Sequence, residues 1–395
     1  MDARAHERKR TPLHALVMQG MRQPRQHSKL SQLARPVMIV LVAVCLLSGI
    51  TGGLLRAGVR LPALDHSAWA AQATGLHAAL MICGFLGTVI GIERAVALRA
   101  AWAFMAPLAS IAGAVSILNS QPMWGAWLFA AASVVFVVVN VKIVSRQTAP
   151  HTWLLLLSAV VWLAGNLHFM RHGLDNATLA PWFGFLVLTI TAERLEMSRL
   201  MRNRPGAQAM LIGVVGMLLA GVLLSLWQPV HGGVLYGAGL FLLALWLGAF
   251  DIARHTVRAQ ALTRYMAICL LSGYAWLAVA GLCWAAYAVG WPCRDAALHA
   301  LGLGFIVSMV MGHAPVILPA VAGIKLHFDH RFYLPLLALH GSLLVRLLPG
   351  GFDPAWRAMG SGLNALAIVL FAATVVSAAW SWRQRHPAIP RRAPR

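Results

Sequence analysis

Of the 395 residues, 59% are hydrophobic and only 11% are charged, a balance that excludes a soluble globular protein. The net charge is +21. We assign this charge to anchoring against anionic lipid at the cytoplasmic face, and not to the binding of nucleic acid.

Apolar runs of about 20 residues, the length that crosses the hydrocarbon core of a bilayer, alternate with charged or Pro/Gly breaks. Twelve transmembrane helices are predicted in chain order, at residues 36–55, 75–97, 101–118, 124–143, 152–170, 180–200, 210–227, 232–250, 264–289, 297–320, 332–349 and 360–382. The predicted fold class is all-α, a polytopic membrane protein of about 12 transmembrane helices. One transmembrane domain, residues 36–382, lies between basic cytoplasmic tails at residues 1–35 and 383–395.

The distribution of Lys and Arg predicts the orientation in the membrane. With a cytoplasmic N-terminus, the outer loops hold 6 of the 32 Lys and Arg residues and the inner loops and tails hold the rest. Cytoplasmic segments of membrane proteins carry this excess, so both termini are predicted on the cytoplasmic side of a bacterial-type inner membrane. The outer residues are Arg56, Arg60, Arg171, Arg294, Arg346 and Arg357.

Three related stretches recur at the inner halves of the second, sixth and tenth predicted helices. GFLGTVIGIER at residues 84–94 and GFLVLTITAER at 184–194 share Gly-Phe-Leu and a closing Glu-Arg. GFIVSMVMGHA at 304–314 begins with Gly-Phe-Ile and ends with Gly-His-Ala. Four helices separate successive copies, which predicts three pseudo-repeated four-helix arcs, at about 36–150, 151–259 and 260–382.

Five histidines fall inside predicted spans, where an ionisable side chain is costly and is by default a functional hypothesis. They are His77, His168, His299, His313 and His340. Imidazole nitrogen suits iron and copper, so a cofactor or metal site is one interpretation. The other is a neutral imidazole that donates to a carbonyl of a neighbouring helix.

The arrangement resembles known heme proteins. Twelve spans in three arcs, with histidines on the second and tenth, resemble the catalytic subunit of the heme–copper oxidases. HAALMICGFLGTVI in the second span and LHALGLGFIVSMVMGHAPV in the tenth are similar to the NnrS family, heme- and copper-binding membrane proteins linked to the nitric oxide response. The resemblance implies heme, copper, a diatomic ligand such as nitric oxide, and a role in nitric oxide response or tolerance. It implies no turnover reaction, so no enzymatic activity is assigned.

His77 and His299 are the predicted axial pair of a heme held between the second and tenth spans, one imidazole from each side. His77 lies on a stripe with Gly84 and Gly91, and such small residues either let a backbone approach the macrocycle or let two helices pack closely. His299 and His313 are 14 residues apart, about 21 Å along one helix, so they serve two sites at different depths.

The other intramembrane histidines are further candidates for cofactor binding. His313 and His340 are predicted to approach one another in the inner half, as additional ligands of iron or copper. His168, near the outer end of the fifth span, has two interpretations: a ligand of a copper site, or a hydrogen-bonding partner of Asn166.

Two Glu-Arg pairs, Glu93-Arg94 and Glu193-Arg194, end equivalent helices at the cytoplasmic boundary. Each Arg lies near a helix C-terminus, where the dipole favours a cation, and each Glu is expected to pair with an Arg of a neighbouring arc. We interpret the pairs as structural clamps, and the alternative is a proton entrance. His313 replaces the pair in the third copy, which marks that position for a specific site.

Transport of a small solute without heme is the alternative function, because twelve spans with internal repeats also describe secondary transporters. Carrier repeats mostly come in twos, with helices broken near the midplane. Here the prolines cluster at span ends, apart from Pro315 and Pro319 near the end of the tenth span. Heme binding is therefore the first prediction.

Overall fold

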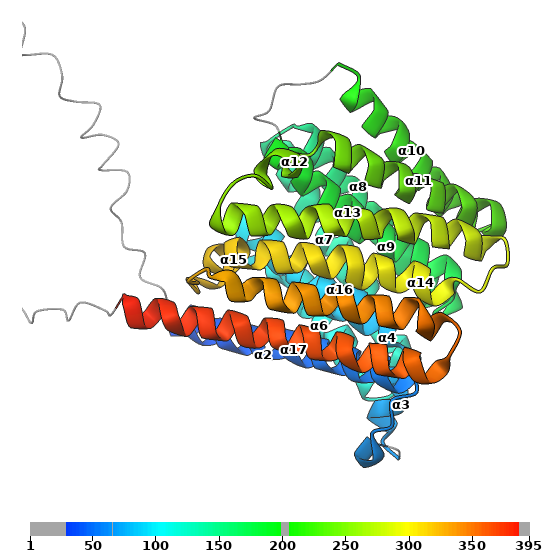
Figure 1. The fold of residues 1–395 in the computed structure, drawn as a ribbon, viewed down its shortest axis with the longest axis horizontal. Helices are drawn as coiled ribbons and strands as arrows, with labels where there is room; N and C mark the ends of the chain where they lie inside the picture. Colours follow the sequence, from blue (N-terminus) through cyan, green and yellow to red (C-terminus); the bar gives the residue numbers. More distant parts are fainter. Residues whose placement is uncertain (1–28, 65, 199–204, 387–395) are drawn as a thin grey trace, which may run out of the picture. The chain divides into compact units, whose positions relative to one another are not determined.

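The structure is a computed structural model, and it describes residues 29–64, 66–198 and 205–386. These residues form helices and no β-strand (Figure 1). Most of the two predicted tails lies outside the described residues. The chain divides into two compact units, Met1–Leu41 and Val42–Arg395, so the predicted transmembrane domain starts six residues before the second unit.

Within the described residues, twelve long helical segments match the twelve predicted spans in order. They are α2 (Lys29–Arg56), α4–η2–α5 (His77–Ala79, Leu80–Gly87, Thr88–Leu98), η3–α6 (Ala101–Phe104, Met105–Leu118), α7 (Pro122–Arg146), α8 (Pro150–His172), α9 (Asn176–Ser198), α10 (Ala207–Ser225), α11 (Pro229–Phe250), α13 (Ala261–Ala288), α14–η4–α15 (Arg294–His299, Ala300–Val307, Ser308–Ala322), η5–α16 (His330–Phe332, Tyr333–Leu347) and α17 (Pro354–Arg385). Short elements connect them, namely η1 (Pro62–Leu64), α3 (Ala68–Gly75), α12 (Ala253–Thr256) and η6 (Pro349–Gly351).

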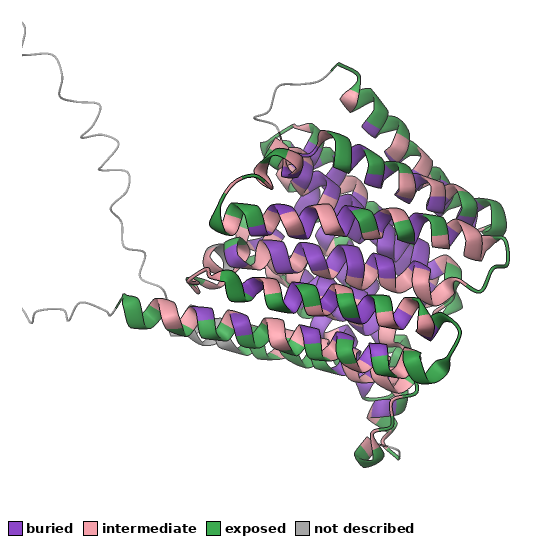
Figure 2. Ribbon diagram, viewed as in Figure 1, coloured by how far each residue is buried: buried purple, intermediate pink, exposed green. Residues whose placement is uncertain are grey.

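Eleven of these segments are long and apolar enough to cross a membrane, counted over the described part of the chain. The predicted all-α, multi-pass membrane fold is confirmed. The remaining segment, α9, ends with Glu193, Arg194 and Glu196, which reduce its apolar character. It is nevertheless buried at every position from Thr178 to Thr189, so neighbouring helices and not lipid surround it. Figure 2 shows the buried residues gathered on the helices around α7, α8 and α9.

The second, sixth and tenth spans meet one another, as expected for equivalent members of three arcs. The sixth span, α9, contacts η2 of the second span and η4 of the tenth, and α5 contacts α15. Both η2 and η4 are π-helices of eight residues, and they contain the Gly-Phe pairs of the first and third repeats. A π-helix is rare and is frequently found at functional sites. The α9 copy is an ordinary α-helix, so the backbone irregularity occurs in two copies of the three.

Glycines allow the close approach of α11 and α13. A Cβ atom added at Gly237 would lie 2.6 Å from the carbonyl oxygen of Gly281 and 2.6 Å from the backbone nitrogen of Ala285. Backbone atoms in a helix cannot rotate away from such a clash. The two helices therefore pack through small residues, as membrane helices commonly do.

We expect Gly237→Val to lower stability by about 1–3 kcal/mol, because the added side chain forces the backbones apart. Gly248→Val is the matched control, since it lies on the same helix and a Cβ there meets nothing within 4 Å. Thermal unfolding of the detergent-solubilised protein compares the two. Equal midpoints would contradict the close crossing of α11 and α13.

Candidate functional site

A cavity of about 460 Å³ lies between α2, the α4–η2 segment, α9, the α14–η4 segment, α16 and α17. This volume is within the range of about 300–1,000 Å³ that is usual for sites of small molecules and cofactors. His77 and His299 both line it, so the structure brings together the two histidines predicted as an axial pair. Much of the remaining wall is apolar, and it includes Met81, Phe85, Phe183, Leu186, Leu303 and Ile306.

His77 is held by α2. Its Nδ1 lies 2.6 Å from the carbonyl oxygen of Gly49. A carbonyl oxygen only accepts, so Nδ1 carries the proton and Nε2 carries the lone pair. Gly53, one turn further along α2, lies against the ring, since a Cβ there would be 2.7 Å from Cε1. The absence of a side chain at Gly53 therefore makes room for the imidazole.

His299 is held by its own helix and by α16. Its Nδ1 lies 3.0 Å from the carbonyl oxygen of Asp295 and 3.1 Å from Oδ1 of the same residue. Arg346 donates to the Asp295 carboxylate through Nε and Nη2, at 2.9 Å each. Nδ1 of His299 is therefore a donor, and Nε2 again carries the lone pair. Among the described residues, neither Nε2 of His77 nor Nε2 of His299 has a hydrogen-bond partner.

Four arginines line the same cavity. All four belong to the six Lys and Arg residues that the sequence predicts on the outer side of the membrane. They are Arg56, Arg294, Arg346 and Arg357. Asp295 is the one carboxylate among the residues that line the cavity in the described structure, so the site carries an excess of positive charge. Such a wall favours a ligand with carboxylate or phosphate groups, to which guanidinium binds in a bidentate manner. From the sequence these arginines indicated only topology, although their departure from the positive-inside pattern was the signal for a site.

His168 lies outside the cavity wall. Its Nε2 bonds to Oδ2 of Asp175 at 3.0 Å, and its ring stacks on His172 with centroids 4.5 Å apart. Burial raises the pKa of Asp175, but hydrogen bonds from His168 and Thr178 outweigh it and leave the pKa below its ordinary value. The side chain of Asn166 does not bond to His168, because its Nδ2 donates to the Phe129 carbonyl and its Oδ1 accepts from Trp182 and Cys83.

His340 joins α16 to α13. Nε1 of Trp276 donates to its Nδ1 at 2.9 Å, and its Nε2 donates to Oγ of Ser272 at 3.1 Å. Both ring nitrogens are therefore used within the protein. The predicted approach of His313 to His340 has no hydrogen bond or ring contact among the described residues. The prediction that His313 and His340 together ligate iron or copper stays untested.

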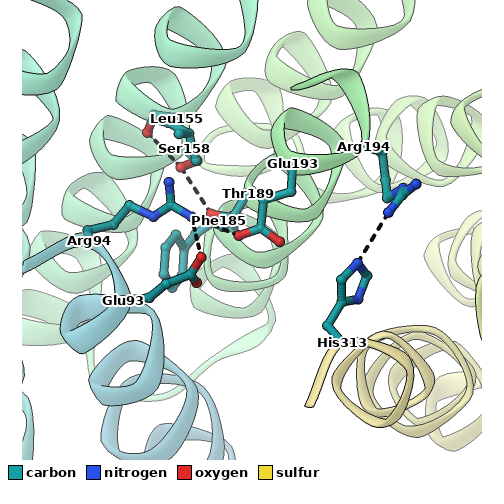
Figure 3. Close-up of polar contacts among 9 residues, drawn as sticks. All are labelled: Glu93, Arg94, Leu155, Ser158, Phe185, Thr189, Glu193, Arg194 and His313. Atoms are coloured by element: carbon teal, nitrogen blue, oxygen red, sulfur yellow. Dashed lines mark hydrogen bonds and ion pairs between the residues drawn. The ribbon is translucent and has the colours of Figure 1, made fainter. Parts of the chain in front are cut away.

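The closing residues of the three repeats form two hydrogen-bonded groups, one around Arg94 and one around Arg194, at the helix ends that the sequence predicts on the inner side; together we call them the inner network (Figure 3). Arg94 on α5 donates through Nη2 to Glu93 at 2.7 Å and to Glu193 on α9 at 3.0 Å. Arg194 on α9 donates through Nη1 to Nε2 of His313 on α15, at 3.2 Å. The predicted pairing of a Glu with an Arg of a neighbouring arc is confirmed for Glu193 and Arg94.

A second ion pair completes this network. Nε of Arg194 donates to Oδ2 of Asp251 at 2.9 Å, and the side chains are 3% and 1% exposed. Nδ1 of His313 donates to the carbonyl of Met309 at 2.7 Å, so both nitrogens of His313 are also used. The clamp interpretation fits this geometry, because each bond ties one central helix to another element. Among the described residues, no group of three or more His, Cys, Asp or Glu side chains is arranged to hold a metal ion.

We expect Arg194→Met to cost about 3–5 kcal/mol of stability, because it leaves the buried Asp251 carboxylate unpaired. The double variant Arg194→Met/Asp251→Asn is expected to recover a large part of this loss. Asparagine removes the charge and its Oδ1 still accepts from the backbone N–H of Ala253, as the Asp251 carboxylate does at 2.7 Å. Thermal unfolding in detergent provides the comparison. A double variant no more stable than the single one would show that the two charges are not coupled.

No curated protein and no solved structure is significantly similar to the chain. A family model with the description "Domain of unknown function (DUF8744)" matches residues 35–380. The matched range contains every residue named for the cavity and for the inner network. The chain belongs to the DUF8744 family.

Proposed function

We propose that this membrane protein binds heme in the cavity, with His77 and His299 as the two axial ligands. The observation that carries the proposal is that both imidazoles line one cavity and each has its Nδ1 proton committed to an oxygen acceptor. Histidines that ligate a metal usually donate the other ring N–H to a carbonyl or a carboxylate, which fixes the tautomer and the ring orientation. Both side chains meet that requirement through partners that the chain itself supplies.

The charge of the cavity supports the same ligand. Heme has an apolar macrocycle and two carboxylates, and the cavity combines apolar side chains with four arginines. Arg346 already engages Asp295, and Arg357 donates through Nε to the carbonyl of Gly350, leaving its other N–H groups for a ligand. These arginines would bind the heme carboxylates and orient the macrocycle between the two histidines.

We further propose that the protein takes part in the response to nitric oxide, in the manner of the NnrS family, in the inner membrane of a bacterium. The stretches that resemble that family are the ones that carry His77 and His299. Heme iron supplies a position that binds diatomic gases. The chain supplies the axial nitrogens, the cations for the carboxylates and an apolar wall that excludes water. Copper is not part of the proposal, because no three ligand side chains converge among the described residues.

We expect the purified protein to carry near-stoichiometric iron and to show a sharp α-band in the dithionite-reduced minus oxidised spectrum. His77→Ala and His299→Ala are each expected to abolish the six-coordinate low-spin spectrum, because each removes one axial nitrogen. His340→Ala is the control, since it also removes an intramembrane histidine but not one that lines the cavity. A featureless spectrum from protein made with ample heme would rule out the proposal.

The role of the arginines is tested with heme and its dimethyl ester, in which both carboxylates are blocked. We expect wild-type apoprotein to bind heme roughly ten to a hundredfold more tightly than the ester, since hydrogen bonds to charged groups contribute about 1.5–3 kcal/mol. In Arg56→Gln/Arg357→Gln the ratio of the affinity for heme to the affinity for the ester is expected to fall toward one. Arg60→Gln/Arg171→Gln, which changes two outer arginines that do not line the cavity, is the control and should keep the preference. If Arg56→Gln/Arg357→Gln still prefers heme to the ester, the heme carboxylates do not bind to Arg56 and Arg357.

A further inference from the structure

The two candidate ligands are held very differently, and His299 is held more strongly. Its Nδ1 donates to the backbone carbonyl of Asp295 at 3.0 Å and also lies 3.1 Å from the carboxylate of that residue, which is fixed by two bonds from Arg346. A charged acceptor makes a hydrogen bond roughly twice as strong as a neutral one. It also raises the basicity of the ligating nitrogen. His299 is thus a strong donor in a fixed orientation.

His77 has a weaker anchor. Its Nδ1 proton faces one neutral acceptor, the Gly49 carbonyl, which belongs to another helix. That helix, α2, has a lipid-exposed side, on which Val44 and Leu47 are 41% and 57% exposed. The wall behind the ring is the backbone of Gly53 on the same helix. α2, which carries the acceptor of His77, can therefore move toward lipid. The acceptor residue of His299, Asp295, is fixed by its ion pair with Arg346 on α16.

The backbone around His77 is also interrupted. α3 ends at Gly75, and Leu76 has φ −113° and ψ 27°, outside the helical region. His77 then begins α4, which has three residues and leads directly into the π-helix η2. His299 also leads directly into a π-helix, η4, but it ends the six-residue α14 with helical dihedrals and with Asp295 one turn behind it. The segment that carries His77 is therefore the one with fewer constraints on its orientation.

From this asymmetry we infer that His77 is the exchangeable ligand and that a diatomic gas binds on the His77 side, while His299 stays in place. The inference rests on the proposed heme. It involves no oxidation or reduction: one bond to the imidazole nitrogen of His77 breaks and one bond to the gas forms. Asp295 and Arg346 are then positioning residues, since they act on the retained ligand.

Carbon monoxide tests the inference on the full-length, dithionite-reduced protein in detergent. When an internal ligand must dissociate first, the apparent affinity for an external ligand is the intrinsic affinity multiplied by the fraction of time that the internal ligand is dissociated. We expect His77→Ala to bind carbon monoxide at least about tenfold faster and more tightly than wild type. His299→Ala also opens one coordination position and therefore gains in carbon monoxide binding as well, but it is expected to retain less heme than His77→Ala, because it removes the ligand that is held more strongly. Gly75→Ala, at a position where a Cβ meets nothing within 4 Å, is the control for changes near the interrupted segment.

A second measurement needs no change at either histidine. Laser photolysis of carbon monoxide from the reduced protein leaves one histidine bound, and its iron–nitrogen stretching band is read by resonance Raman spectroscopy. We expect this band to lie at lower frequency in Asp295→Asn than in wild type, because the retained His299 loses its charged acceptor. Asp175→Asn, which changes the partner of His168, should leave the band unchanged.

The outcomes separate the two proposals. Faster binding in His77→Ala and a shifted band in Asp295→Asn support the assignment. Faster binding in His299→Ala alone, or an iron–nitrogen band of unchanged frequency in Asp295→Asn, would assign the exchangeable role to His299. Either result would overturn the inference. If His77→Ala does not fold, the Raman comparison decides by itself. Protein without heme absorption before any gas is added would remove the proposed function, and this failure is recognised without the carbon monoxide data.

Discussion

A charge inside a membrane protein must be neutralised by a partner from the same protein, because lipid offers neither counter-charge nor hydrogen bond. The centre of this fold depends on that constraint. Arg94 can be accommodated only where Glu93 and Glu193 reach it, and Arg194 only where Asp251 and His313 reach it. These bonds tie α5 to α9 and α9 to α15. The three repeated helices therefore have one relative position in which their inner ends are satisfied, and the cavity forms elsewhere along the same helices.

The three copies of the repeated stretch contribute different kinds of residue to the cavity. The first and third copies each carry a histidine followed by a π-helix, and the two histidines face one space. The second copy, α9, has no histidine and no π-helix, and it supplies Leu179, Phe183 and Leu186 to the wall. The first and third copies thus bring an imidazole to the cavity wall, while the second copy supplies only apolar side chains to it. The proposed heme would use both kinds of wall.

The five intramembrane histidines separate into two classes by their hydrogen bonds. His313 and His340 use both ring nitrogens within the protein, and His168 lies outside the cavity wall with its Nε2 bonded to Asp175. His313 and His340 are therefore the imidazoles whose hydrogen-bonding groups are fully used within the bundle, whereas the contacts of His168 lie outside the cavity. His77 and His299 each keep one nitrogen without a partner in the described structure, and they alone of the five line the cavity. These two nitrogens are therefore the imidazole atoms of the set that remain available to a ligand in the cavity.

The sequence by itself determined the membrane-spanning helices, and it also predicted the orientation, the three arcs and a common site for His77 and His299, both of which line one cavity. Hydropathy suffices for the helices because a backbone in lipid must satisfy its own hydrogen bonds. Internal similarity suffices for the repeat because equivalent helices occupy equivalent places. Only the tertiary structure decided that Arg56, Arg294, Arg346 and Arg357 converge, that Asp295 links Arg346 to His299, and that Asn166 bonds away from His168. These contacts join residues from different arcs, and their distances depend on how the helices cross and on the π-helices, neither of which appears in the hydropathy or spacing of one chain segment.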